Sequence, residues 1–172
     1  NGNLTSVTPP GRPPHLFTYT ARDETSAYEP PVVAGAGSTQ YQYDLDRNLT
    51  QVVRPDGQTV DFGHDGAGRL GDLRLPDGNQ YVFGYDTATG KLASVITKDT
   101  SLNYVYNGAL LARSVLLAGD LNATVDRSYD NDLRRIADSV NGGSTVTYQY
   151  DADSLLTRAG SESLTRSAQN GL

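Results

Sequence analysis

The feature that most constrains the fold of this sequence is a short alternating segment that recurs at an almost fixed interval. Its copies read "TQYQYD", "TVDFGHD", "QYVFGYD", "LNYVYN", "VDRSYD" and "TVTYQYD". Four of the five intervals between copies are 21 residues and one is 23. A period near 20 residues indicates an array of supersecondary units. The residues that close the copies are Tyr43, His64, Tyr85, Tyr106, Tyr129 and Tyr150.

Each copy predicts a half-buried β-strand. Side chains of a strand alternate between two faces, so the closing residue and those two and four places before it share one face. In one copy these are Tyr81, Phe83 and Tyr85. Across the copies only His64 and Arg127 interrupt the apolar or aromatic character of this face, while many of the residues between are small or polar.

Turn residues follow each strand. The residue after the closing position is an aspartate or asparagine, whose side chain accepts a backbone N–H two residues on and starts a turn. Glycines then supply positive φ at the first turn and again in the "PDG" turn that ends the unit. The Asx positions are Asp44, Asp65, Asp86, Asn107, Asp130 and Asp151, and the turn glycines are Gly57, Gly68, Gly78 and Gly90.

The apolar residues in the second strand of the unit are separated by an odd number of positions. A leucine follows the first turn, as at Leu49 and Leu70, and a second apolar residue stands three places later, as at Val52 and Leu73. Three is odd, so the two would face opposite ways in a flat strand. The spacing therefore predicts either a β-bulge or a strand covered on both faces.

The predicted fold is all-β, with tandem antiparallel hairpins in one curved, spiralling sheet and little or no helix. Residues 1–8 match the second half of a unit, and 38–159 hold about six units. Residues 9–37 contain six prolines and one predicted strand, His15 to Ala21, which indicates an irregular inset packed on the sheet. Residues 160–172 are a degenerate repeat or tail. We expect the array to continue beyond this sequence.

Composition excludes several functions. The net charge is −6 with no lysine or arginine cluster, so a nucleic acid partner is not expected. No apolar run reaches the length of a membrane span, and the absence of cysteine rules out disulfides. The only histidines are His15 and His64, which argues against a zinc site.

Three local motifs are better explained by structure than by chemistry. Asp44, Asp46 and Asn48 have the spacing of a calcium loop, but that loop needs glycine at its sixth place and glutamate at its twelfth, where Leu49 and Pro55 stand. "PPGRPP" is more typical of a rigid connector than of a ligand for a proline-binding domain. Six equivalent Tyr–Asp pairs do not make one catalytic constellation, so no catalytic, cofactor or metal residues are predicted.

The unit, with Tyr-Asp, Gly, Leu and "PDG" at fixed places, resembles the YD repeat of the Rhs family, which is related to the C components of bacterial toxin complexes and to teneurins. The match is best from Tyr43 to Asp65 and from His64 to Asp86, and covers about residues 38 to 159. His64 in place of tyrosine and Asn107 in place of aspartate depart from it.

The resemblance implies a non-enzymatic structural segment of a secreted or cell-surface β-shell that encloses or scaffolds a toxin or other polypeptide. Its partners would be neighbouring repeats, copies of itself at open strand edges, or the enclosed polypeptide, without cofactors. The alternative is an extracellular binding or self-assembling module that uses its tyrosine rows. The exposure of Tyr41, Tyr85, Tyr104 and Tyr148 should discriminate between them.

Overall fold

The computed structural model describes residues 2–31 and 37–167, and every regular element in these ranges is a β-strand. No helix among them is long and apolar enough to cross a membrane. The strands are β1 (Ser6–Val7), β2 (His15–Tyr19), β3 (Thr25–Glu29), β4 (Thr39–Tyr43), β5 (Leu49–Val53), β6 (Thr59–His64), β7 (Leu70–Arg74), β8 (Gln80–Tyr85), β9 (Leu92–Ile96), β10 (Thr100–Asn107), β11 (Leu110–Ala118), β12 (Leu121–Tyr129), β13 (Arg135–Val140), β14 (Thr145–Tyr150), β15 (Leu156–Ala159) and β16 (Glu162–Ser163).

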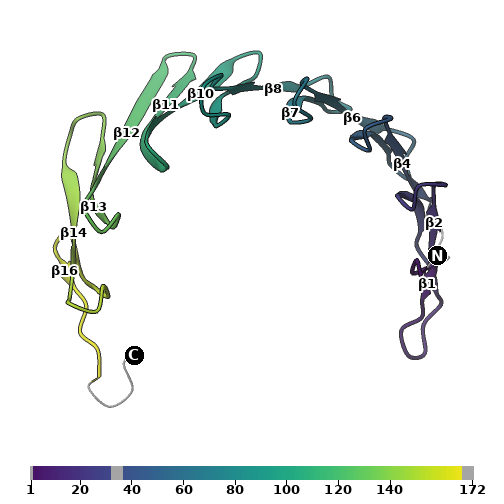
Figure 1. Cartoon of the computed structure of the whole chain (residues 1–172), viewed down its shortest axis with the longest axis horizontal. Helices are drawn as coiled ribbons and strands as arrows, with labels where there is room; N and C mark the ends of the chain where they lie inside the picture. The colour runs from purple at the N-terminus through teal and green to yellow at the C-terminus, as the bar shows by residue number, and fades with distance from the viewer. Residues whose placement is uncertain (1, 32–36, 168–172) are drawn as a thin grey trace. The chain divides into compact units, whose positions relative to one another are not determined.

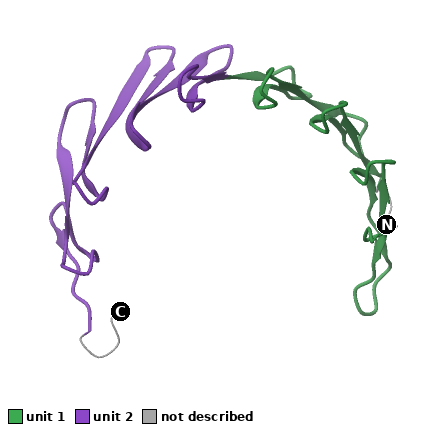
Figure 2. Ribbon diagram, in the orientation of Figure 1, with its two compact units in different colours: residues 1–83 green, residues 84–172 purple. Residues whose placement is uncertain are grey.

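The strands are hydrogen-bonded in sequence order from β1 to β16 as one open sheet, with antiparallel pairing (Figure 1). This confirms the predicted all-β class and the succession of antiparallel hairpins. Two compact units divide the chain, residues 1–83 and residues 84–172 (Figure 2). Within each of these two compact units the same arrangement of hairpins recurs, and the strands from β10 to β12 in residues 84–172 are longer than the others.

The sheet is a single layer whose apolar side chains are only half-buried. None of the described residues is fully buried. In β4 the three residues of the tyrosine face, Thr39, Tyr41 and Tyr43, are half-buried, and Gln40 and Gln42 between them are exposed. This is the alternation that the sequence predicts. Because no second layer covers the strands, each hairpin depends on the neighbouring hairpins for its burial.

A β-bulge resolves the odd spacing of the second strand. Tyr41 lies opposite Val52, and Gln42 opposite Gln51, but Tyr43 lies opposite Leu49 because Thr50 is the extra residue. Leu49 and Val52 therefore share the tyrosine face. The same register shift occurs in the hairpins that end at Tyr19, His64, Tyr106, Tyr129 and Tyr150.

The "PDG" turns close as their sequence predicts. Gly57 has a φ of 79° and Gly78 a φ of 84°, a region that favours glycine. In the first of these turns Asp56 Oδ1 accepts the N–H of Gln58, and the backbone of Arg54 exchanges hydrogen bonds with Gly57 and Gln58. The second turn repeats this arrangement: Asp77 Oδ1 accepts the N–H of Asn79, and the backbone of Leu75 exchanges hydrogen bonds with Gly78 and Asn79.

The stretch 9–37 differs from the expected irregular inset. It contributes two strands, β2 and β3, to the sheet itself, and β3 pairs with β4. The predicted strand His15 to Ala21 corresponds to β2, while β3 was missed because it lacks the leucine that marks the second strand of a unit at Leu49 and Leu70. Residues 32–36 of this stretch and 168–172 of the tail lie outside the described residues, and the domain boundaries stay a prediction.

Candidate functional site at the tyrosine junctions

The recurring site of this chain is the place where a closing aromatic residue reaches the preceding hairpin. The hydrogen-bonded ladder between the closing strand and the strand before it ends three residues before the closing position. This holds for each of these strand pairs, and beyond that point the two strands diverge. We call each such place a tyrosine junction. The last paired residues are Leu16, Gln40, Asp61, Val82, Asn103, Asp126 and Thr147, which precede Tyr19, Tyr43, His64, Tyr85, Tyr106, Tyr129 and Tyr150.

A tyrosine hydroxyl closes the gap between the diverging strands. At the five junctions named below, the hydroxyl donates to a backbone carbonyl oxygen two residues before the last paired residue of the preceding strand. This places a directed bond where the ladder has stopped, at 2.8–3.0 Å. The bonds run from Tyr19 to Leu4, Tyr43 to Thr25, Tyr106 to Leu92, Tyr129 to Leu111 and Tyr150 to Arg135.

The aspartate after the tyrosine builds the turn that positions it. Asp44 Oδ1 accepts the backbone N–H groups of Asp46 and Asn48, both at 2.9 Å, and the Asp44 and Asn48 backbones close the loop. Asp65, Asp130 and Asp151 repeat both side-chain bonds with the residues two and four places on. The carboxylate is thus occupied within its own turn, as the Asx-turn prediction requires.

The fourth residue of the turn has a positive φ, whether or not it is glycine. Gly68 (75°) and, in a turn one residue longer, Gly90 (72°) occupy this place, and Arg47 (70°) and Leu133 (62°) occupy it elsewhere. The left-handed conformation costs roughly 1–2 kcal/mol for a residue with a Cβ. The network of the Asp side chain is therefore strong enough to hold that conformation without glycine.

Sequence reasoning missed one junction, at Tyr19. Thr20 takes the place of the aspartate: its Oγ1 accepts the N–H groups of Arg22 and Glu24, both at 3.2 Å. Threonine makes this kind of turn more weakly than aspartate, but with the same geometry. The signal was present as Tyr-Thr in "LFTYTA", at an interval of 24 residues from Tyr43.

A cation also joins the turn of one unit to the aromatic ring of the next. Arg134 pairs with Asp130 through Nε at 2.8 Å, and its guanidinium lies over the Tyr150 ring, 5.1 Å from the centroid. Lys91 occupies the matching place and lies 5.2 Å over the Tyr106 ring. Such contacts contribute about 0.5–1 kcal/mol at exposed sites. This second link could not be recognised from the repeat pattern alone.

Arg127, one of the two interruptions of the apolar face, is accommodated by polar partners. It donates to Ser114 Oγ at 2.9 Å on one side and lies opposite Asp138 on the other. Asp138 Oδ2 in turn accepts the Tyr148 hydroxyl at 3.0 Å, and this bond raises the pKa of Tyr148 above its usual range. Arg127 therefore lies in a polar patch of the sheet face, where Ser114 and Asp138 accompany its charge.

Asn107 marks a departure from the turn plan. β10 continues through it, and it pairs with Leu110 across the short loop of Gly108 and Ala109. The longer Asx turn of the other units is absent at this place. The predicted roles of the sixteen repeat positions stay a proposal, although the turn glycines named above adopt the positive φ that was expected.

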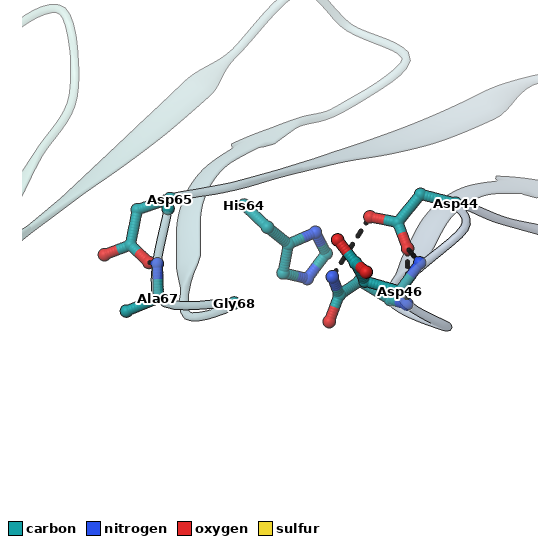
Figure 3. A pocket seen from close by; sticks show the side chains of 8 residues that line it. Asp44, Asp46, His64, Asp65, Ala67 and Gly68 are labelled. Carbon is teal, nitrogen blue, oxygen red and sulfur yellow. Dashed lines mark hydrogen bonds between the residues drawn. The ribbon is translucent and has the colours of Figure 1, made fainter.

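His64 and the neighbouring turns line an open polar pocket of about 540 Å³, shown in Figure 3. Asp44 and Asp46 approach the imidazole from the preceding turn, and Asp65 belongs to its own turn. Among residues 2–31 and 37–167 no group of three or more His, Asp or Glu side chains is arranged to hold a metal ion.

Hydrogen bonding lowers the pKa of the turn carboxylates. The Arg69 side chain has the largest effect on the pKa of Asp65, followed by the Arg69 backbone N–H, and Asn48 acts in the same way on the pKa of Asp44. A carboxyl whose pKa is lower in the folded state stabilises that state above its ordinary pKa, near 4. The contribution is lost as the pH falls below that value.

We therefore expect the 172-residue chain to lose resistance to denaturant between about pH 4.5 and pH 2.5. Asp65→Asn keeps an oxygen acceptor but removes the charge paired with Arg69, so it should flatten this decline. The unfolding midpoint in urea, measured across the pH range, tests the expectation. Asp153→Asn is the matched control, since the carboxylate of Asp153 has no partner among the described residues. Equal slopes for both variants would refute the role of Asp65.

These features define a class: a repeat-array protein in which similar, recurring junctions tie successive β-hairpins together. The chain belongs to the Teneurin YD-shell family, whose sequence profile it matches over residues 32–170. It is a YD-repeat, or Rhs-type, array, as the sequence motifs predict. A comparison with curated proteins finds no match.

Solved structures share the fold. A Tc holotoxin pore from Photorhabdus luminescens aligns with a TM-score of 0.70 and 15% identity, over 85% of this chain and 9% of that chain. The TcdB2–TccC3 complex aligns with a TM-score of 0.70 and 15% identity, over 84% and 9%. The same complex without its hypervariable C-terminal region gives 0.72 and 14%, over 92% and 10%. The chain therefore spans about a tenth of the length of these chains.

Proposed function

We propose that this chain is a non-enzymatic segment of the wall of a YD-repeat shell that encloses or scaffolds a secreted toxin or another polypeptide. The observation that carries the proposal is the tyrosine junction itself. The same hydroxyl bond and the same turn recur from hairpin to hairpin, which serves to join units and not to bind a particular substrate. Family membership and the shared fold support this assignment.

A covered ring face at Tyr148, and not the exposure of the tyrosines, disfavours the alternative of a sugar-binding surface. Tyr41, Tyr85, Tyr104 and Tyr148 are half-buried, between the two outcomes that were to discriminate the hypotheses. The Arg135 guanidinium lies 5.0 Å over the Tyr148 ring, so one face of that ring is already covered by the chain itself. A sugar would have to displace this cation before it could stack there.

Partners and location follow from the same proposal. Neighbouring repeats would pair with β1 and β16, the two edges of the described sheet, and an enclosed polypeptide would face one side of the wall. The wall would act outside the cytoplasm, in a secreted or cell-surface protein. Its chemistry needs no cofactor.

The test is a cryo-electron microscopy map of the natural protein that contains this sequence, combined with protease protection. We expect residues 38–159 in a closed wall around additional density, and a polypeptide that resists protease until mild denaturant opens the wall. An open array with solvent on both faces, or a second polypeptide digested at the same rate with and without denaturant, would overturn the proposal.

A further inference from the structure

The junction at His64 is built differently from the junctions that tyrosine closes. The ladder between β5 and β6 ends at Gln51 and Asp61, so the acceptor that a tyrosine at position 64 would reach is the Leu49 carbonyl oxygen. Imidazole is shorter than a phenol, and its ring makes no hydrogen bond with any described residue. The bond that closes the gap at Tyr43, Tyr106 and Tyr150 is therefore missing here.

The second link is missing at the same junction. Asn48 stands where Arg134 and Lys91 stand in their units, four or five residues after the turn aspartate. Its side chain is too short to cover the next ring, and it donates back to Asp44 Oδ2 at 3.0 Å instead. Asn48 and His64 both line the pocket between the two turns, whose lining side chains are drawn in Figure 3.

What remains to join β5 and β6 is a short ladder. Three residue pairs hold it, Gln51 with Asp61, Val52 with Val60 and Val53 with Thr59. The Gln51 side chain adds a hydrogen bond to Asp61 Oδ1 at 2.6 Å. β13 and β14 are also joined by three pairs, but their junction has both the Tyr150 hydroxyl bond and the Arg134 stack. The two places differ mainly in junction chemistry.

We propose that the β5–β6 joint is a built-in weak seam, where neighbouring hairpins separate more readily than at a tyrosine-closed joint with a ladder of the same length. The seam is a property of the fold and goes beyond the wall function, since it holds whatever polypeptide the array encloses. In a quasi-one-dimensional array each hairpin is stabilised by its neighbours, so a joint with fewer links opens locally more often than an otherwise similar joint. A missing hydrogen bond at the joint raises the opening equilibrium about tenfold.

Native-state hydrogen exchange of the 172-residue chain, followed by mass spectrometry, tests the seam. Peptides that cover 49–53 and 59–64 should exchange about tenfold faster than peptides that cover 135–140 and 145–150. Equal protection in the two hairpin pairs would overturn the proposal, and this comparison needs no variant.

Paired variants assign the effect to the junction. Asn48→Arg with His64→Tyr should restore both links and slow exchange at β5 and β6 about tenfold, because Arg69 already makes the required pair with Asp65 in a neighbouring turn. His64→Phe is the matched control: it restores an aromatic ring without a hydroxyl and should recover only part of the protection. A double variant that folds, by circular dichroism, and exchanges like the parent chain would also overturn the proposal.

Discussion

Deleting residues 44–64, one whole repeat, should leave a shorter sheet that still folds. The deletion connects Tyr43 to Asp65, so the closing tyrosine is again followed by an intact Asx turn with its Gly68. Two strands are lost, which preserves strand direction and the face of every later residue. The tyrosine–carbonyl bonds of the remaining junctions are untouched.

The expected measurements are a retained β-sheet circular dichroism spectrum and a urea m-value lower by roughly an eighth, in proportion to the chain removed. Deleting residues 44–53 instead removes one strand and its turn. That control reverses the direction of everything that follows, so Tyr43 and the next closing residue could no longer lie at the same edge of the sheet. If the whole-repeat deletion unfolds the chain as fully as the single-strand deletion, modular assembly is refuted.

The period and the turn chemistry were predictable because both are local. Asp44 accepts a hydrogen bond from a residue four places on, and Gly68 adopts the positive φ of its own turn. Such local features can be predicted from the residue types in the sequence. The bulge at Thr50 was predicted only as one of two options, since a spacing of three residues does not show which strand takes the extra residue.

Contacts between units were not predictable from the same pattern. The acceptor of the Tyr129 hydroxyl, the Leu111 carbonyl oxygen, is set by strand register and by the bulge, and any residue type supplies a carbonyl there. The stack of Arg134 on Tyr150 likewise depends on how far adjacent turns lie apart. Thr20 was overlooked because a threonine turn in a proline-rich stretch has a weaker signature than Tyr-Asp.

Register also explains how a sheet without a buried core among its described residues can be specific. In residues 2–31 and 37–167 the side chains are half-buried at best, so hydrophobic burial alone would tolerate a slip of one hairpin against the next. The tyrosine hydroxyl bond and the β-bulge can each form in only one strand register. Directed polar links at the diverging ends of the ladders thus supply the uniqueness that interior packing supplies in two-layer domains.

The largest effect of a single substitution is expected at Tyr129. Tyr129→Phe removes only the hydroxyl bond to Leu111 and should lower the free energy of unfolding by about 1 kcal/mol. Tyr129→Ala also removes a half-buried ring and should lower it by about 3 kcal/mol, near the low end for aromatic truncations. Tyr129 suits this test because no lysine or arginine of the described ranges stacks on its ring, unlike the ring of Tyr150.

Urea unfolding followed by circular dichroism, together with hydrogen exchange of β11 and β12, measures both losses. Ser128→Ala is the matched control, because Ser128 is an exposed neighbour on the opposite face of the same strand and should change stability by less than about 0.5 kcal/mol. A phenylalanine variant as stable as the parent would show that the hydroxyl bond does not hold the junction. An alanine variant no weaker than the phenylalanine variant would show the same of the ring, and the account of unit-to-unit joining by tyrosine would then fail.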